Sequence, residues 1–327
     1  MQPASIHHDK IGDDINKAAE ILTAGGLVSI PTETVYGLAA NALNEKAVTR
    51  IFAAKNRPNF DPLIVHLSEK NEIFNYVKNF DERLKVLADH FIPGPLTLLL
   101  EKKDIIPDLV TSGLNNVAIR IPNHPLTLNL LKILDFPLAA PSANPFGYIS
   151  PTRAQHVARQ LGDRVDYILD GGPCTVGVES TIVGVENDKI TIFRKGGIPI
   201  EDIENLLGSV VVRDYSDSNP GAPGMLKSHY APAKKFTIWP FNSPPPRSTT
   251  YNIGYLRFKD PLPNIPEQHQ LVLSTKGCLE EATRNLFAFM RILDEMDVDE
   301  IITELLPETG LGQAINDRLR RAAAKRH

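Results

Sequence analysis

The stretch that decides the fold is Gly25–His66, GGLVSIPTETVYGLAANALNEKAVTRIFAAKNRPNFDPLIVH. Its first apolar run, Leu27–Ile30, predicts a buried strand; Pro31 then opens a polar turn, a helix follows, and Leu63–Leu67 predicts a second strand. Two polar loops, residues 32–36 and 55–58, therefore flank these strands. Because α/β sheets tend to present such loops along one edge, where ligands bind, we expect both loops at a binding site.

The surrounding chain continues this alternation of strands and helices. Asp81 is a plausible N-cap for a helix, and the runs Leu96–Leu100 and Val117–Ile121 predict strands. The order of elements is irregular, which favours a mixed sheet over a purely parallel one. We therefore expect an α/β domain over residues 1–212, a linker rich in Pro, Gly and Ser over 213–235, and a small α/β domain over 236–327.

Composition excludes several classes of protein. A chain of 327 residues is long enough for two domains, and 42% hydrophobic with 23% charged residues is typical of a globular protein. The net charge of −4 argues against a globally basic nucleic-acid binder, although a local basic patch stays open. Cys174 and Cys278, the only cysteines, can form neither a disulfide framework nor a thiolate zinc site. With no apolar run long enough to span a bilayer and no apolar leader, the expected location is the cytoplasm.

Basic and hydroxyl side chains at loop positions are the candidates for chemistry. The basic ones are Lys55, Arg57, Arg120, Arg194, Lys195 and Lys227, and the hydroxyls are Thr32, Thr34, Ser142, Ser150, Ser180 and Thr181. Arginine and lysine bind phosphates and carboxylates, so this set suggests a nucleotide site without a P-loop; the alternative is scattered surface charge. Arg120, inside an apolar strand, needs an anionic partner or a wet cavity, and a structural salt bridge is equally open. The cationic segment 310–325 is expected to be a solvated helix face.

Six motifs in order give a more specific hypothesis: PTETVYGL, KNRPxxxPLIVH, VAIRIP, APSAN, ESTIV and IFRKGGI. Together they resemble the Sua5/YrdC/YwlC family, and APGMLKSHYAP with GLGQAINDRLRRAA resembles its longer, two-domain Sua5 form. The resemblance implies a twisted, mixed YrdC-like sheet with helices around a large cavity, and a small Rossmann-like C-terminal domain. It also implies an enzyme, an L-threonylcarbamoyladenylate synthase that consumes L-threonine, bicarbonate and ATP. Its product would serve N6-threonylcarbamoyladenosine formation at position 37 of ANN-decoding tRNAs, completed by a separate transferase complex.

The same resemblance assigns site residues by motif position. The residues implied to bind L-threonine are Thr34, His66, Arg120, Ala140 and Ser180; those implied to bind ATP are Arg57, Asp61, Asn116, Ser142, Ser150, Arg194 and Tyr230. Relatives often differ at positions 61 and 116. Lys55, Arg57 and Arg194 would neutralise phosphate charge in the reaction, and Tyr230 would reach the site from the linker.

No direct metal ligand is assigned, and Mg²⁺ is expected to arrive on the ATP phosphates, with Glu33 or Asp61 near its water shell. The alternative function is a module that binds tRNA or double-stranded RNA without synthase activity, because one-domain relatives are associated with RNA. The synthase reading itself leaves room for a weak contact with tRNA.

Overall fold

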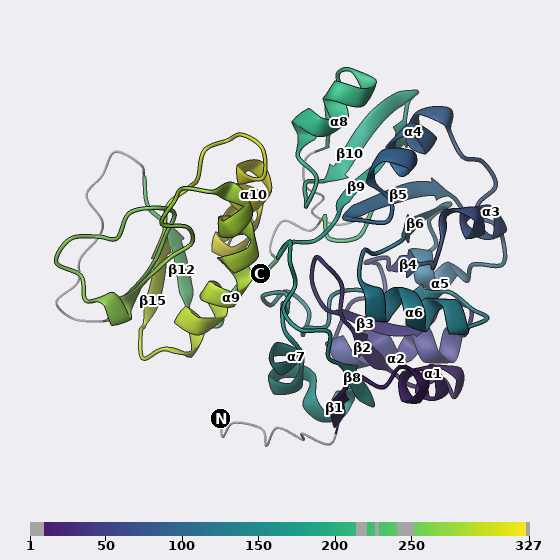
Figure 1. The fold of residues 1–327 in the computed structure, drawn as a ribbon, viewed down its shortest axis with the longest axis horizontal. Helices are drawn as coiled ribbons and strands as arrows, with labels where there is room; N and C mark the ends of the chain where they lie inside the picture. The colour runs from purple at the N-terminus through teal and green to yellow at the C-terminus, as the bar shows by residue number, and fades with distance from the viewer. Residues whose placement is uncertain (1–9, 214–220, 226–228, 241–251, 325–327) are drawn as a thin grey trace.

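A computed structural model describes residues 10–213, 221–225, 229–240 and 252–324 (Figure 1). Its first domain contains one mixed sheet. From edge to edge the strands are β1 (Ile11–Gly12), β8 (Tyr167–Leu169), β2 (Val28–Ile30), β3 (Gly37–Asn41), β7 (Leu138–Ala139), β4 (Ile64–His66), β6 (Asn116–Arg120), β5 (Leu96–Glu101), β9 (Thr181–Glu186), β10 (Lys189–Arg194) and β11 (Val211–Val212). Parallel and antiparallel neighbours alternate irregularly, which confirms the expected mixed sheet.

Helices surround this sheet in the first domain. They are α1 (Ile15–Thr23), α2 (Glu45–Lys55), α3 (Ile73–Tyr76), α4 (Glu82–Phe91), α5 (Asp108–Thr111), α6 (Pro125–Ile133), α7 (Ala154–Leu161) and α8 (Ile200–Leu207). Their ends follow local chemistry: the side chain of Asp81 accepts from the backbone N–H of Arg83, and Asn44 caps α2 in the same way. None of the helices in the described residues is long and apolar enough to cross a membrane.

Strand β3 is one of the elements that the sequence pattern did not predict. We expected the turn after Pro31 to lead directly into a helix, but Gly37–Asn41 first forms a strand antiparallel to β2. Residues 37–40 are buried and small or apolar, so they lack the polar alternation that marks a half-exposed strand.

The central strands present two different faces. On one face the apolar side of α4 packs against the sheet, with Leu84, Leu87 and Ala88 buried in the main core. The other face carries Ile64, Ala118 and Leu99, and here the linker residues Ala222 and Met225 cover it. The linker therefore packs on the open face of the sheet.

The second domain is a parallel four-stranded sheet in the order β12 (Lys235–Ile238), β15 (Glu300–Thr303), β13 (Ile253–Arg257) and β14 (Gln270–Val272). Helices α9 (Leu279–Glu295) and α10 (Gly312–Ala323) lie between this sheet and the first domain (Figure 1). Their apolar residues share a core with Val35, Ile149 and Val178 of the first domain. An all-parallel sheet with covering helices agrees with the Rossmann-like expectation.

Candidate active site

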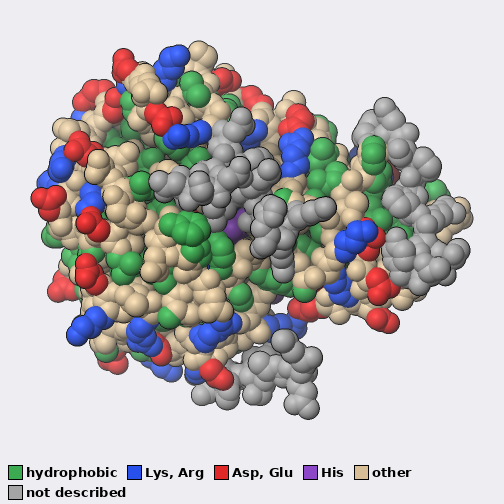
Figure 2. Space-filling view, turned by 180° about the vertical axis from the view of Figure 1, so that it is seen from behind, with side chains coloured by type: hydrophobic (Ala, Val, Ile, Leu, Met, Phe, Trp, Pro, Cys, Tyr) green, Lys and Arg blue, Asp and Glu red, His purple; other side chains and the backbone are tan. Residues whose placement is uncertain are grey.

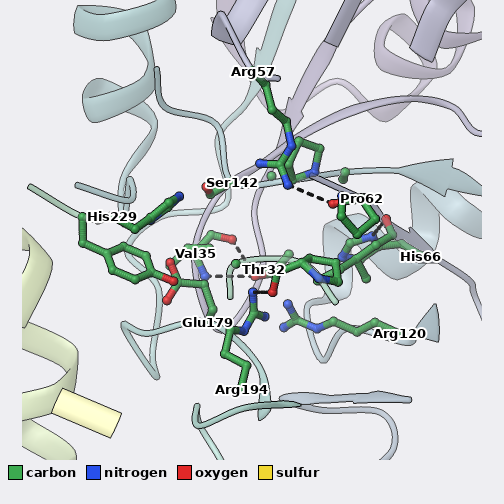
Figure 3. Close-up of a pocket in the computed structure, with 17 residues that line it drawn as sticks. Thr32, Val35, Arg57, Pro62, His66, Arg120, Ser142, Glu179, Arg194 and His229 are labelled. Atoms are coloured by element: carbon green, nitrogen blue, oxygen red, sulfur yellow. Dashed lines mark hydrogen bonds between the residues drawn. The ribbon is translucent and has the colours of Figure 1, made fainter. Parts of the chain in front are cut away.

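A small cavity lies on the open face of the first sheet, beneath the linker (Figure 3). Its lining residues are Thr32, Val35, Gly37, Arg57, Pro62, Ile64, His66, Arg120, Ala140, Pro141, Ser142, Glu179, Arg194, Pro223, Gly224, His229 and Tyr230. The expectation that the two loops meet at one edge of the sheet is corrected by this placement on a face. The cavity volume is about 50 Å³, smaller than the large cavity expected, and four linker residues are among those that line it.

Strand register brings His66 and Arg120 together. They are paired positions on the parallel neighbours β4 and β6, so their side chains leave the same face of the sheet. Burial, followed by the charge of Arg120, lowers the pKa of His66 to about 3, so this imidazole is neutral near pH 7. Its Nδ1 lies 3.2 Å from the carbonyl oxygen of Ile64.

Arg120 forms a buried salt bridge and also faces a cavity, which are the two possibilities that the sequence left open. Its Nη2 donates to Glu33 Oε1 at 2.8 Å in a buried ion pair, and its side chain also lines the cavity. Thus Glu33 is the partner of an arginine, and its suggested place near a metal's water shell stays a prediction. Close by, Thr32 Oγ1 lies 2.8 Å from Thr34 Oγ1 and donates to the carbonyl of Val35 at 2.6 Å. Thr34 is buried beneath Thr32 and supports the wall from behind.

Arg57 enters the cavity from the loop after α2. Its Nη2 pairs with Asp61 Oδ2 at 2.9 Å, and it also donates to the carbonyls of Asp61 and Pro62, at 3.0 and 2.8 Å. Burial lowers the pKa of Arg57, and Asp61 partly offsets this. Asp61 itself is fully buried and does not line the cavity, so it orients Arg57.

Lys55 lies outside the cavity lining. Its Nζ donates to the backbone carbonyls of Ser142 and Asn144, and its side chain is 1% exposed. Burial and the neighbouring Arg57 lower its pKa well below the usual value. In this structure Lys55 anchors the loop that presents Ser142 and follows Ala140, both of which line the cavity, and its contact with phosphate stays a prediction.

Arg194, at the end of β10, is held mainly by neutral oxygens. It donates to the backbone carbonyl of Ser180 at 3.1 Å, to Ser180 Oγ at 3.0 Å and to the carbonyl of Pro223 at 3.3 Å. Ser180 Oγ is in turn 2.7 Å from Thr97 Oγ1, so Ser180 lies under Arg194 and outside the lining. Burial lowers the pKa of Arg194 to about 10, and it is still a cation near pH 7.

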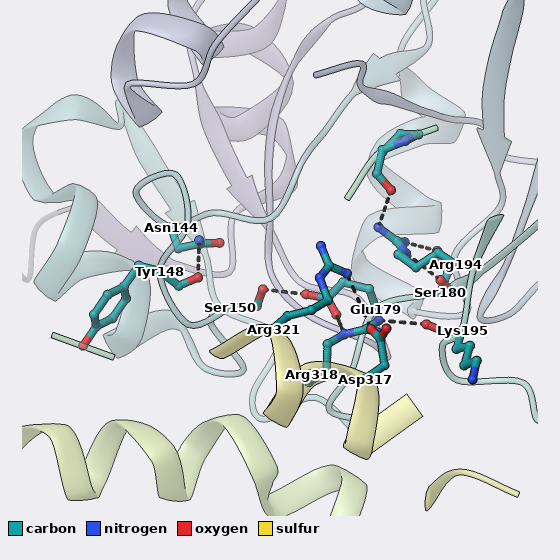
Figure 4. A network of polar contacts seen from close by, with 11 residues as sticks. Asn144, Tyr148, Ser150, Glu179, Ser180, Arg194, Lys195, Asp317, Arg318 and Arg321 are labelled. Atoms are coloured by element: carbon teal, nitrogen blue, oxygen red, sulfur yellow. Dashed lines mark hydrogen bonds and ion pairs between the residues drawn. The ribbon is translucent and has the colours of Figure 1, made fainter. Parts of the chain in front are cut away.

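The second domain contributes to this site through α10 (Figure 4). Arg318 Nε pairs with Glu179 at 2.9 Å, and Glu179 also accepts from Ser150 Oγ at 2.6 Å. Burial raises the pKa of Glu179, but Arg318 and Arg194 outweigh it and the net direction is down. Ser150 therefore does not line the cavity but contacts the lining residue Glu179.

The same helix holds the linker residue Tyr230. The guanidinium groups of Arg318 and Arg321 lie 4.9 and 4.8 Å from the centre of its ring, and Phe287 of α9 stacks on it at 5.5 Å. The expectation of a solvated cationic face is therefore wrong for these two arginines, which are 0% and 2% exposed.

The predicted residues divide into three groups. Those that line the cavity are Arg57, His66, Arg120, Ala140, Ser142, Arg194 and Tyr230; those directly behind it are Thr34, Lys55, Asp61, Ser150 and Ser180. Asn116 is not brought to the site, since it is exposed at the opposite end of β6 from Arg120 and pairs with Glu101. Lys227 lies outside the described residues.

Sequence reasoning missed several lining residues. Glu179 had one available signal, its place directly before Ser180 in ESTIV, and His229 had its place beside Tyr230. Arg318 and Arg321 of α10 contact the lining residues Glu179 and Tyr230, and no local sequence pattern indicated these contacts. Within the described part of the chain, no three His, Cys, Asp or Glu side chains gather as a metal site.

Comparison with known proteins identifies the family. Residues 20–196 match the family model Sua5_yciO_yrdC, described as "Telomere recombination", and residues 198–324 match "Threonylcarbamoyl-AMP synthase, C-terminal domain". This protein therefore belongs to the Sua5/YrdC family of α/β proteins, and it has the two-domain form.

Two curated relatives resemble it over nearly the whole chain. The threonylcarbamoyl-AMP synthase of Pyrococcus abyssi is 39% identical, covering 95% of this chain and 94% of the relative, and that of Bacillus subtilis is 40% identical, covering 95% and 93%. A crystal structure of P. abyssi Sua5 complexed with L-threonine superposes with a TM-score of 0.85 at 37% identity, covering 94% of each chain.

Proposed function

We propose that this protein synthesises L-threonylcarbamoyladenylate from L-threonine, bicarbonate and ATP, with release of pyrophosphate. The observation that carries the proposal is the convergence of Arg57, Arg120 and Arg194, from distant segments, on one cavity with the neutral His66. Similarity over nearly the full length to threonylcarbamoyl-AMP synthases supports the same activity.

The site divides into two ends with different tasks. Arg120 offers a guanidinium to the carboxylate of L-threonine, and His66 and Ala140 bound the space beside it. Arg57 and Arg194 lie toward the linker side and would bind phosphate oxygens. In this proposal the amino acid would lie beside the α-phosphate of ATP, and alignment of that kind is a large part of catalysis.

The reaction requires no nucleophilic side chain from the protein. The ammonium of threonine first loses a proton in the site. The resulting amine attacks bicarbonate or CO₂ to give a carbamate, with loss of water when bicarbonate reacts and of a proton when CO₂ reacts. An oxygen of that carbamate attacks the α-phosphorus of ATP, the bond to the bridging oxygen breaks, and pyrophosphate leaves. Arg57 and Arg194 offset the negative charge that develops on the phosphates.

The proposal includes Mg²⁺, which would bind together with ATP. It would be held mainly by phosphate oxygens and water, and when bound it supplies further neutralisation of phosphate charge. In the same proposal a separate transferase complex carries the threonylcarbamoyl group onto adenosine 37 of ANN-decoding tRNAs.

The decisive experiment measures pyrophosphate release from ATP while L-threonine and bicarbonate are omitted in turn, with mass detection of the adenylate. We expect release to require both, and Arg57→Ala and Arg120→Ala to abolish it without unfolding. Arg50→Ala is the matched control, because Arg50 is a half-exposed arginine paired with Asp166. Release at an unchanged rate without threonine would contradict the proposal.

The RNA-binding alternative makes a different prediction for the same variants. It requires tRNA binding that weakens steeply with salt and survives Arg57→Ala and Arg120→Ala. On the face shown in Figure 2, basic side chains of the described residues lie among acidic ones.

A further inference from the structure

Glu33 and Arg120 form an ion pair at the amino-acid end of the cavity. The two side chains are 6% and 4% exposed, and the second oxygen of Glu33 accepts from the backbone N–H of Asn123 at 3.1 Å. Both carboxylate oxygens are thus engaged, which fixes the orientation of Glu33. Glu33 does not line the cavity, whereas Arg120 does. The carboxylate therefore acts on a ligand only through the arginine and through its charge.

Arg120 keeps donor capacity for a ligand despite this pair. Glu33 uses Nη2, while Nε is buried and has no hydrogen-bond partner among the described residues. A buried donor without a partner is costly, so its presence beside a cavity points to an incoming acceptor. Figure 3 shows Arg120 beneath His66 and directed toward Arg194.

The balance of charge differs between the two ends of the cavity. At the amino-acid end, Arg120 is offset by Glu33, and His66 is neutral. Of the two arginines proposed to bind phosphate, Arg57 pairs with Asp61, whereas Arg194 forms no ion pair with a described carboxylate and is held by Ser180 and Pro223. The amino-acid end is thus close to neutral, and a ligand that carries no net charge fits it best. Arg194 retains positive charge for an anion.

We propose that Glu33 is the positioning and charge-balancing partner of Arg120, and that it makes this end of the site select a zwitterionic α-amino acid over an anionic acid of the same shape. The inference rests on the proposed function. L-Threonine brings an ammonium together with its carboxylate, and without Glu33 that ammonium would be repelled by Arg120 at short range in a poorly solvated cavity. An acid that lacks the amino group gains nothing from Glu33 and is repelled by it.

The test compares two ligands in direct binding experiments by calorimetry. They are L-threonine and (R)-3-hydroxybutyrate, which is L-threonine without its amino group. Glu33→Gln should raise the dissociation constant of L-threonine about tenfold, whereas that of (R)-3-hydroxybutyrate should stay the same or fall. Glu33→Asp, which keeps the charge, should restore the preference for L-threonine. A purely structural role would weaken both ligands alike, and an unchanged ratio of the two affinities would overturn the proposal.

A reciprocal variant keeps the test valid if Glu33→Gln does not fold. Arg120→Gln leaves the negative charge of Glu33 without its partner, so this variant should bind cationic L-threoninamide more tightly than the unaltered protein does. If L-threoninamide does not bind more tightly to this variant, the proposed role of Glu33 in selectivity is contradicted. Glu304→Gln is the control, because it neutralises the carboxylate of another partly buried pair, with Arg257 in the second domain. Failure of the proposed function itself is distinguishable, since it would appear as absent threonine-dependent pyrophosphate release in the unaltered protein.

Discussion

Lys55 shows how a residue can support a cavity that it does not line. A lysine in KNRP was expected to face phosphate, yet its ammonium donates to the carbonyls of Ser142 and Asn144. Lysine reaches these oxygens because α2 ends at Lys55 and the chain then turns through Asn56 in the left-handed region, φ 53°. The same charge thus orders the loop that carries Ser142.

We expect Lys55→Met to lower both stability and activity. The two carbonyls would lose their buried donor, a loss of about 1–3 kcal/mol in the free energy of unfolding. Urea denaturation measures the first effect, and the KM for ATP should rise because Ser142 is no longer held. An unchanged KM for ATP in a folded variant would show that the anchor is dispensable.

His66 should make the protein less stable in acid. Its pKa in the folded protein, about 3, lies below the value near 6.5 expected when unfolded, so the unfolded chain binds more protons between these pH values. Stability from this group is complete above pH 6.5 and falls as the pH drops toward 3. At pH 5 the loss is about 2 kcal/mol by linkage.

The expected result is that His66→Gln shows a smaller loss of stability between pH 7 and pH 5 than the unaltered protein, by urea denaturation. His156→Gln is the matched control. The pKa of His156 is also lowered to about 3, first by burial and then by Arg291, but His156 does not line the cavity. Both variants should lose less stability between pH 7 and pH 5 than the unaltered protein. Only His66→Gln should lower the affinity for L-threonine.

At the scale of elements, the linker is the part that closes the site. Pro223, Gly224, His229 and Tyr230 line the cavity, and the volume left beneath them is about 50 Å³. Sites for drug-sized ligands usually measure about 300–1,000 Å³, so ATP does not fit the volume found here. These four linker residues are therefore in a closed arrangement over the cavity.

Gly224→Ala should disturb this closed arrangement. Gly224 has φ +72°, and a Cβ at this position would lie 3.0 Å from Nη1 of Arg194. We expect a rise of about tenfold in the KM for ATP, measured by pyrophosphate release. Gly113→Ala is matched in backbone strain, since its φ is +78°, but a Cβ there has no neighbour within 4 Å. Equal kinetics for the two alanine variants would mean that contact with Arg194 does not matter.

Most elements of the first domain could be predicted from sequence because their signals are local. Asn44 and Asp81 cap helices through their own side chains, and β5 and β6 are mostly apolar. The residues that pair across long distances could not be found in this way. Glu33 and Arg120 are 87 positions apart, and Glu179 and Arg318 are 139 apart, so no periodicity links them. Register and domain packing decide which charges meet.

At the scale of the whole molecule, the second domain supports the cavity from behind, through its contacts with Glu179 and Tyr230. Arg318 joins Glu179 and the carbonyl of Lys195 to α10, while Phe287 and Arg321 hold Tyr230. The role that sequence alone left unassigned is therefore structural support of the cavity and its linker.

Arg318→Met should impair the enzyme severely. Glu179 would be left buried without its partner, and breaking such a pair costs about 3–5 kcal/mol. We expect a lower melting temperature and loss of pyrophosphate release, whereas Arg320→Met, on the same helix but paired with Glu308 at the surface, should be nearly silent. Removal of everything after residue 213 should likewise leave a folded first domain with much reduced activity. Full activity in either case would contradict a supporting role.

The ion pair between Glu179 and Arg318 also has a consequence for synthesis of the protein. Translation produces the sheet, Arg57, Arg120 and Arg194 well before α10, so a nascent chain can fold its first domain while Glu179 still lacks Arg318. A ribosome-bound or prematurely terminated chain that stops before residue 318 would carry an incomplete site. Adenylate production would then reach its full rate only after α10 has been made and docked, so full activity reports that both domains have been assembled.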